Sequence, residues 1–389
     1  MVRVRTLLVI LSDRLSEVAR RGQLSPRYFN PGEVFDQVDF LLTNNDRVDP
    51  AIVQPLVGRA GLALHHVPAP SFVASWGWRP DRLRGWTRDA AQLAATLRPA
   101  VVRCYAAGLN ALAGVEIKRQ LGVPLVLSIH TNPDVRRAQA SWSRPKDKLF
   151  WITSEAIERA VIPEADVVLP AHESARIFAG RRGAHRVELV YNAINLDGLV
   201  AKVDYGLARP PAVVSVGRHL VEKNPEHVIR ACAELGASIT LIGSGPVTPH
   251  LQRVARVSGA KATFIPALPN AEVCGRLASF DVFATHSEYW ELSKALLEAL
   301  LAGLPVVLNR RHGEPVPELA GGLGLLVGNS TAGYAAAIKT LFADERVRRA
   351  LGQRGREEAE RRFHPRIMEQ RVADLYRELL GRSDREGPG

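Results

Sequence analysis

Two basic side chains follow a glycine in the segment Gly217-Arg-His-Leu-Val-Glu-Lys-Asn224, directly after the apolar run 212–216. The glycine permits a tight backbone turn, and Arg218 and Lys223 are fixed cations of the kind that bind a diphosphate. A solvated basic loop is the more frequent meaning of an isolated Gly-Arg-x4-Lys pattern. The pattern gains weight only if other phosphate-binding features accompany it.

A second group of polar residues lies between the apolar run 281–284 and Gly303. We expect a helix to begin near Leu292, with Ser293 as its N-cap, and to stop at Gly303. Unpaired N–H groups in the first turn of a helix bind phosphate. The predicted diphosphate-binding residues of this half are therefore Gly217, Arg218, Lys223, Leu292, Ser293 and Lys294. The neighbouring carboxylates of Glu288, Glu291 and Glu298 are suited to accept hydrogen bonds from sugar hydroxyls, although acidic residues near a first turn also simply favour the helix.

Short apolar runs alternate with longer amphipathic segments along most of the chain. The strands expected from these runs are 5–11, 38–43, 101–105, 125–129 and 166–170 in the first half, with a further segment 187–192, and 212–216, 238–242, 262–265, 281–284 and 305–308 in the second. Such alternation predicts an α/β protein with two parallel, doubly wound, Rossmann-like sheets. Ligands bind beyond the carboxyl ends of parallel strands, where the residues named above lie.

The length of 389 residues exceeds what one hydrophobic core supports, so two domains are expected. A proline-containing stretch from Tyr205 to Pro211 separates two series of strands. We therefore predict an N-terminal domain over 1–207 and a C-terminal domain over 208–363. The periodic segment 364–382 predicts a helix that packs back on the first domain, and 383–389 is expected to be a polar, disordered tail.

The basic loop, the turn Gly243-Ser-Gly-Pro246 and the segment from Glu288 to Pro305 resemble, in this order, the C-terminal half of the family-4, group 1 glycosyltransferases. The resemblance runs from about Val213 to Phe363, and more weakly through Val190–Asp197. It implies the GT-B fold, in which two Rossmann-like domains, here an acceptor domain over 1–207 and a donor domain over 208–363, face each other across a cleft. It also implies that Arg218 and Lys223 hold the donor diphosphate and that Glu298, the second glutamate of a Glu-x7-Glu motif, binds the nucleotide ribose.

One position departs from the family pattern, because Trp290 stands where the family has its first glutamate. Glu291 lies one position later and Glu288 two positions earlier, and we favour Glu291 as the substitute, with Glu288 as the alternative catalytic carboxylate. His130, which follows the run 125–129, resembles the family's catalytic histidine that faces the donor sugar. Gly32, in Asn30-Pro-Gly32, is predicted to approach the diphosphate from the other domain, although such a tripeptide is normally only a turn.

The resemblance implies a retaining glycosyltransferase that moves a sugar from a nucleotide-diphosphate-sugar to a glycan, lipid-linked or small-molecule acceptor, as in glycan or cell-envelope biosynthesis. No DxD-type acidic pair follows a strand, so we expect no metal and no cofactor beyond the nucleotide-sugar donor substrate. Two other functions stay open: a nucleotide-sugar epimerase or phosphorylase of the same fold, and a non-catalytic nucleotide-sugar-binding protein.

Composition limits the possible partners and compartments. Apolar residues make up 46% and charged residues 23% of the chain, as in globular proteins, and no apolar run approaches the length of a membrane span. With no secretory signal, a cytoplasmic protein is predicted. The formal charge of +11 attracts anions, which leaves peripheral association with the inner face of an acidic membrane open. The sequence contains no nucleic-acid recognition motif, so nucleic acid is not an expected partner.

Three tryptophans, Trp76, Trp78 and Trp86, lie among arginines in the first domain. Aromatic rings beside cations are suited to an acceptor sugar or to a lipid interface. The alternative, which we favour from the sequence, is a helix entry with packed tryptophans. A second segment, 136–150, has the same basic and aromatic character, and the same alternatives apply to it.

Overall fold

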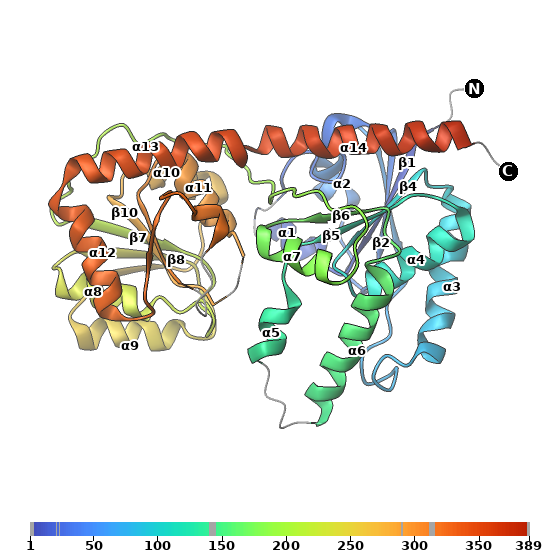
Figure 1. The fold of residues 1–389 in the computed structure, drawn as a ribbon, viewed down its shortest axis with the longest axis horizontal. Coiled ribbons are helices and arrows are strands. Elements are labelled where there is room, and N and C mark those ends of the chain that lie inside the picture. The colour runs from blue at the N-terminus through green and yellow to red at the C-terminus, as the bar shows by residue number, and fades with distance from the viewer. Residues whose placement is uncertain are drawn as a thin grey trace. The chain divides into compact units, whose positions relative to one another are not determined.

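The computed structural model describes residues 4–20, 22, 24–139, 145–288, 291–310 and 316–386, and it divides into two compact units. The first unit contains residues 1–193 and 366–389, and the second contains 194–365. In each unit, a parallel sheet lies between helices (Figure 1).

The sheet of the first unit has six parallel strands in the order β3-β2-β1-β4-β5-β6. These strands are β1 (Thr6–Leu11), β2 (Gln37–Leu42), β3 (Gly61–His66), β4 (Val101–Tyr105), β5 (Leu125–Ile129) and β6 (Val167–Pro170). Its helices are α1 (Leu15–Arg20), α2 (Pro50–Val53), α3 (Pro80–Leu97), α4 (Leu109–Leu121), α5 (Pro133–Gln139), α6 (Pro145–Val161), α7 (Glu173–Arg181) and α14 (Pro365–Glu386), with short 3-10 turns at Pro31–Glu33 and Gln54–Val57.

Alternate residues of the strands supply two hydrophobic cores, one on each face of this sheet. In β1, Leu8 and Ile10 pack against α3, α4, α6 and α7. Leu7, Val9 and Leu11 point the other way and pack against α1, α2 and α14. Because successive side chains of a strand point to opposite faces, a strand covered on both sides is apolar throughout. All six side chains of β1 are buried, which explains the continuous apolar run of the sequence.

The second unit has a six-stranded parallel sheet in the order β12-β11-β10-β7-β8-β9. Its strands are β7 (Ala212–Val216), β8 (Ser238–Ile242), β9 (Lys261–Ile265), β10 (Val282–Thr285), β11 (Val306–Asn309) and β12 (Leu325–Val327). Its helices are α8 (Glu226–Glu234), α9 (Thr248–Ser258), α10 (Asn270–Leu277), α11 (Lys294–Ala302), α12 (Thr331–Ala343) and α13 (Glu345–Arg362), with a 3-10 turn at Pro317–Leu319. Helices α8, α9 and α12 share a core with one face of the sheet.

The boundary between the units lies earlier than the sequence predicts, at 193/194 instead of 207/208. The segment 194–207 is attached to the second unit. The buried ring of Tyr205 donates its hydroxyl to the carbonyl oxygen of Gly303 over 2.9 Å, and Lys202 Nζ donates to the carbonyl oxygen of Ala278 over 3.1 Å. A proline-rich stretch therefore lies just inside the second unit instead of marking its edge.

Three other segments differ from expectation. Val187 makes an isolated bridge to Val168 but belongs to no strand. Helix α14 continues through Glu386, so 383–386 is helical instead of a disordered tail. The edge strand β3 was not expected from the sequence. Its central side chains are only partly buried, and its last two residues are histidines, so it lacks a continuous apolar run.

Candidate active site

The strand order of the second unit places its site beside β7. Strands β8 and β9 lie on one side of β7 and strands β10, β11 and β12 on the other, so the order reverses between β7 and β10, which are paired. Such a reversal leaves a crevice beyond the carboxyl ends of the two strands, where doubly wound sheets bind ligands. The loop after β7 contains Arg218 and Lys223, and the loop after β10 contains Glu288 and Glu291.

Backbone packing between two glycine-containing loops fixes the loop after β7. The N–H of Gly217 donates to the carbonyl oxygen of Ile242 over 3.0 Å. The N–H of His219 donates to the carbonyl oxygen of Ser244 over 3.1 Å. A Cβ on Gly243 would overlap the carbonyl oxygen of Gly217, so only glycine permits this approach. The glycines of Gly243-Ser-Gly-Pro246 thus have a structural explanation: they let the second loop support the first.

Arg218 is exposed and makes no ion pair with any residue that the structure describes. Lys223 is different, because its ammonium group is partly buried and ion-paired with the carboxylate of Glu291. A backbone hydrogen bond of 2.7 Å, from the N–H of Glu288 to the carbonyl oxygen of Glu222, joins the same two loops. The structure therefore joins the loop that contains both predicted cations to the loop of Glu288 and Glu291, and it pairs Lys223 with Glu291.

The carboxylates of Glu288 and Glu291 have different surroundings. Glu288 Oε1 lies 2.8 Å from His286 Nε2 and accepts a hydrogen bond of 3.2 Å from Asn329 Nδ2. Glu291 is instead the counter-ion of Lys223. Of the two candidates for the missing family glutamate, Glu291 is the one in contact with a predicted phosphate-binding cation. Trp290, the residue that holds the family position, lies outside the described residues.

Helix α11 begins where the sequence predicts. Ser293 has extended backbone angles, and its Oγ accepts a hydrogen bond of 3.2 Å from the N–H of Leu296, so the expected N-cap is confirmed. Gly303 ends the helix at φ 81°, as expected for a glycine C-cap. The side chain of Leu292 is buried, so this residue can offer a ligand only its backbone. Lys294 starts the helix and is partly buried.

Glu298 lies one turn further along α11, with only 6% of its surface exposed. Its Oε1 accepts a hydrogen bond of 2.9 Å from Asn270 Nδ2. Burial raises the pKa of Glu298 to about 7, and the hydrogen bond from Asn270 and the charge of Lys294 oppose that rise. Burial likewise lowers the pKa of Lys294. A carboxylate at this position is poised to change protonation near neutral pH.

In the first unit, His130 directly follows β5, as predicted, and three residues fix it. Its Nδ1 lies 2.8 Å from Asn192 Oδ1, its ring stacks on Tyr105 at a centroid distance of 5.6 Å, and its carbonyl oxygen lies 3.2 Å from His172 Nε2. An amide oxygen can only accept, so Nδ1 is the protonated nitrogen and the lone pair of the neutral ring lies on Nε2.

Packing within the first unit explains why position 32 is a glycine, and this explanation needs no contact with a phosphate. Its φ of 66° is unfavourable for other residues, and an added Cβ would lie 2.8 Å from Ala373 of α14. Its N–H already donates to Glu369 over 3.3 Å. The next residue, Glu33, is paired with Arg59, two residues before β3 begins, which places this turn towards the amino ends of the strands. These contacts favour packing against α14 over the diphosphate contact that we expected.

Several residues that contact the predicted site residues within each unit were not identified from the sequence. Asn270 on α10 contacts Glu298, Asn192 contacts His130, and Tyr105 stacks on His130. No local pattern marks them, because each contact joins residues at least 25 positions apart. His286 is an exception: it follows the apolar run 281–284 closely and could have been selected by the same rule as His130.

Two features are absent from the described residues. No group of three or more histidine, cysteine, aspartate or glutamate side chains in that part of the chain is arranged to hold a metal ion. Within the same residues, every helix is too short or too polar to cross a bilayer.

Two family models match this chain, and together they match more than half of it. The group 1 glycosyl transferase model matches residues 210–344, and the glycosyltransferase family 4 model matches residues 37–197. The chain belongs to the family-4, group 1 glycosyltransferases. The first range contains the loops after β7 and β10 together with α11, and the second contains His130.

Relatives of this family-4 chain carry transferase names. The chain is 28% identical over 284 residues to the sulfoquinovosyl transferase SQD2 of Arabidopsis thaliana, a match covering 69% of this chain and 54% of that one. It is 32% identical over 195 residues to a GDP-mannose-dependent phosphatidylinositol monomannoside mannosyltransferase of Mycolicibacterium smegmatis, covering 46% of this chain and 50% of that one. The chain thus spans about half the length of the curated relatives that it matches.

Solved structures show that the fold of this family-4 chain is GT-B. The sucrose-phosphate synthase of Thermosynechococcus elongatus matches with a TM-score of 0.72 and 18% identity, over 97% of this chain and all of the other. Anabaena HepE in complex with UDP matches with a TM-score of 0.73 and 15% identity, over 96% of this chain and all of the other. At these identities the likeness concerns the fold alone.

Proposed function

We propose that the protein is a retaining glycosyltransferase that uses a nucleotide-diphosphate-sugar as donor. The observation that carries the proposal is the arrangement beside β7 and β10, where Arg218, Lys223 and the capped start of α11 lie at the strand-order reversal. Fixed cations and helix N–H groups stabilise the negative charge that develops on a leaving diphosphate. Membership of the family and the transferase names of its relatives support the same reaction.

In this proposal, each residue of the second unit has one task. Arg218 and Lys223 neutralise the diphosphate, and Glu298 accepts hydrogen bonds from the ribose. Lys223 must exchange Glu291 for phosphate when the donor binds, because one ammonium group cannot keep both contacts at full strength. The released Glu291 carboxylate then becomes available to a hydroxyl of the donor sugar. His130 of the first unit orients or stabilises the sugar during transfer.

The nucleotide and the acceptor are further parts of the proposal. Uridine diphosphate is the first nucleotide to test, because HepE, a fold neighbour, is described in complex with UDP. GDP-sugars follow, because one relative is named for its dependence on GDP-mannose. The acceptor is a glycan or a lipid-linked molecule, for which the name of the phosphatidylinositol monomannoside mannosyltransferase gives support.

Reversible contact with an acidic membrane is consistent with the formal charge of +11.

The proposal is tested by donor binding and turnover in matched lysine variants. Calorimetric titration of UDP-, GDP- and ADP-sugars first identifies the donor, and release of the nucleoside diphosphate with a candidate acceptor measures transfer. Lys223→Ala should lower turnover by at least about a hundredfold, as expected for loss of a fixed charge on the leaving group. Lys339→Ala removes an exposed lysine of α12 and should leave turnover unchanged. Equal turnover in the two variants would reject the role of Lys223.

A further inference from the structure

Four large apolar side chains form an exposed surface on the first unit, which we call the apolar surface. Val73 and Trp76 come from the loop before α3, and Leu149 and Ile152 come from α6; between 45% and 73% of each side chain is exposed. Single exposed apolar residues are common, but a tryptophan exposed to this degree beside three aliphatic neighbours is not. The donor site of the second unit uses none of these residues.

The loop and α6 are packed against each other, so the four side chains belong to one surface. The ring of Phe150 lies 5.2 Å from that of Trp78 and 5.5 Å from that of Phe72, centroid to centroid. A Cβ on Gly77 would lie 2.7 Å from the side chain of Leu149. Phe150 and Leu149 of α6 therefore contact the loop directly. The exposed apolar residues of the loop and of the helix consequently lie on the same side of the unit.

The backbone of the loop holds Trp76 outward. Trp76, Gly77 and Trp78 have consecutive positive φ angles of 53°, 81° and 56°, which tryptophan rarely adopts. The buried Ser75 fixes this turn, because its Oγ donates to the carbonyl oxygen of Ser71 over 2.7 Å and accepts from the N–H of Trp78 over 3.0 Å. Trp78 packs inward as a result, while Trp76 is directed to solvent. Strained backbone of this kind is concentrated at functional sites.

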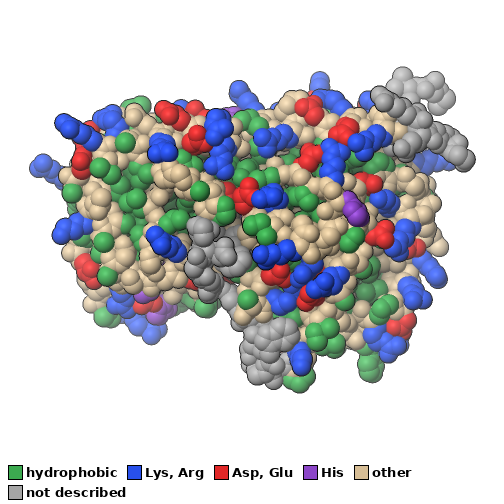
Figure 2. Space-filling model, viewed as in Figure 1, with side chains coloured by type: hydrophobic (Ala, Val, Ile, Leu, Met, Phe, Trp, Pro, Cys, Tyr) green, Lys and Arg blue, Asp and Glu red, His purple; other side chains and the backbone are tan. Residues whose placement is uncertain are grey.

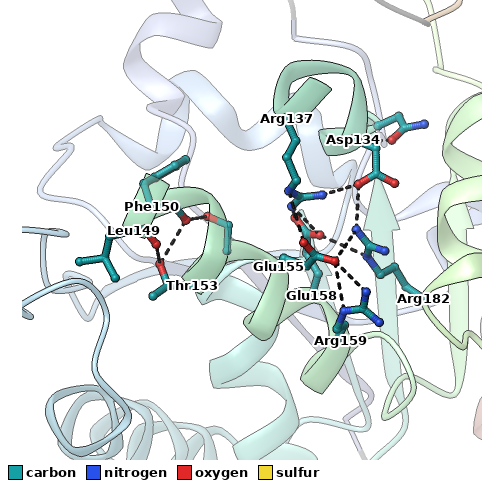
Figure 3. Close-up of polar contacts among 11 residues, drawn as sticks. Asp134, Arg137, Leu149, Phe150, Thr153, Glu155, Glu158, Arg159 and Arg182 are labelled. Carbon is teal, nitrogen blue, oxygen red and sulfur yellow. Dashed lines mark hydrogen bonds and ion pairs between the residues drawn. The ribbon is translucent and has the colours of Figure 1, made fainter. Parts of the chain in front are cut away.

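Two of the three acidic residues of α6, Glu155 and Glu158, are neutralised inside the unit. Glu158 accepts two hydrogen bonds of 2.9 Å from Arg137, and Arg182 lies 3.4 Å from both Glu155 and Glu158. In Figure 3, Glu155 and Glu158 face Arg137 and Arg182, whereas Leu149 lies on another side of the helix. Helix α6 thus directs its glutamates towards α5 and α7, where two arginines balance their charge.

The charge around the apolar surface is positive. Segments 71–82 and 145–152 together carry four cations, Arg79, Arg82, Lys146 and Lys148, and two carboxylates, Asp81 and Asp147. All four cations are exposed; Asp81 pairs with Arg79 at 3.0 Å and lies 4.0 Å from Arg82, whereas Lys146 and Lys148 make no ion pair with any described residue. Lys148 lies one helical turn from Ile152, so a lysine and an isoleucine share one side of α6. Figure 2 shows basic and hydrophobic side chains next to one another near the protruding end of α5 and α6, which Figure 1 locates.

We infer that the apolar surface binds the headgroup region of an anionic lipid bilayer, with Trp76 inserted and the surrounding lysines and arginines on lipid phosphates. Tryptophan is suited to that depth because its ring is apolar and its N–H is polar, and each nearby cation adds attraction to an anionic leaflet. A second copy of the same face would bring like charges together. A sugar would require hydrogen-bonding side chains that these four apolar residues do not supply. This inference does not depend on the transferase reaction.

Sedimentation with vesicles of phosphatidylcholine, with and without phosphatidylglycerol, tests the inference. The protein should bind the anionic vesicles, and high salt should weaken the binding. Trp76→Ser should weaken it about tenfold, the effect of one buried aromatic side chain. Lys146→Glu with Lys148→Glu should weaken it by at least as much and remove most of the dependence on phosphatidylglycerol. Val257→Ser, at an equally exposed apolar position on α9 of the second unit, should have no effect.

The other outcomes overturn the inference. Absence of binding to any vesicle, or equal binding by Trp76→Ser and Val257→Ser, would reject the lipid surface. If Trp76→Ser instead changed the mass in light scattering, the surface would be a contact between copies; if it abolished retention on immobilised glycans, the surface would bind sugar. Nucleotide titration of the same variants separates this inference from the proposed function, because all of them should bind the donor like the unaltered protein.

Discussion

The carboxyl group of Glu298 is buried in α11, next to Asn270 and one turn after Lys294. Its burial raises the pKa to about 7, which means that the folded protein holds a proton that the unfolded chain releases near its ordinary value. The stabilisation from this proton is complete below the unfolded pKa and is lost as the pH rises through about 7. A ribose hydroxyl that donates to Glu298 would favour the ionised form and would therefore expel the proton.

Glu298→Gln should remove this pH dependence while keeping an oxygen that accepts from Asn270. Between pH 6 and pH 8.5, the free energy of unfolding of the unaltered protein should fall relative to that of the variant, by about 1 kcal/mol. Urea unfolding at several pH values measures the difference. Parallel pH curves for the two proteins would show that the buried carboxyl does not titrate in this range.

The ion pair between Lys223 and Glu291 leads to a second prediction at this scale. If Glu291 competes with the donor for Lys223, Glu291→Gln should tighten binding of the free nucleoside diphosphate about fivefold, the effect of releasing one partly exposed ion pair. The same variant should transfer more slowly, because the carboxylate available to the donor sugar is gone. Titration calorimetry and turnover assays measure the two effects, and weaker diphosphate binding would contradict the competition.

At the scale of secondary structure, two serine N-caps provide a matched pair. Ser293 caps α11 and Ser330 caps α12, and each Oγ accepts one backbone N–H at 3.1 to 3.2 Å. Replacing either with alanine should lower the free energy of unfolding by about 1 kcal/mol. Only Ser293→Ala should also weaken nucleotide binding, because α11 begins at the predicted diphosphate site. Unfolding and titration of both variants check this, and equal nucleotide affinities would remove α11 from the site.

The sequence predicts elements well where one local rule decides them. The cap at Ser293 and the stop at Gly303 follow from helix-end chemistry, and the apolar run 125–129 forms the strand that His130 directly follows. Gly32 is different, because the structural requirement for glycine comes from Ala373, more than 300 residues away in the chain, which no local pattern shows. Likewise, the pairing of Glu291 with Lys223 depends on two loops that only the sheet order brings together.

At the scale of the whole molecule, the early boundary between the units depends on Tyr205 and Arg348. Tyr205 is almost fully buried, and a Cβ on Gly352 would lie 2.7 Å from its ring and hydroxyl. The buried guanidinium of Arg348 donates to the carbonyl oxygen of Tyr205 over 2.9 and 2.6 Å and to that of Leu341 over 2.7 Å. Residues 194–207 therefore complete the core of the second unit although they precede its first strand.

Two fragments of the second unit should consequently differ in stability. A fragment of residues 194–365 keeps Tyr205 and should unfold cooperatively and bind nucleotide, since the unit contains all its own strands and the loops after β7 and β10. A fragment of residues 208–363 lacks the ring of Tyr205 and leaves Arg348 without one of its acceptors. Loss of a buried aromatic side chain alone costs about 3 to 5 kcal/mol, out of the roughly 5 to 15 kcal/mol that stabilise a typical domain.

The shorter fragment should therefore be partly or wholly unfolded at 25 °C, as circular dichroism in urea would show. Adding Tyr205→Ala to the longer fragment should reproduce most of the loss. Equal urea midpoints for the two fragments would mean that residues 194–207 pack on the second unit but contribute nothing to its free energy of unfolding.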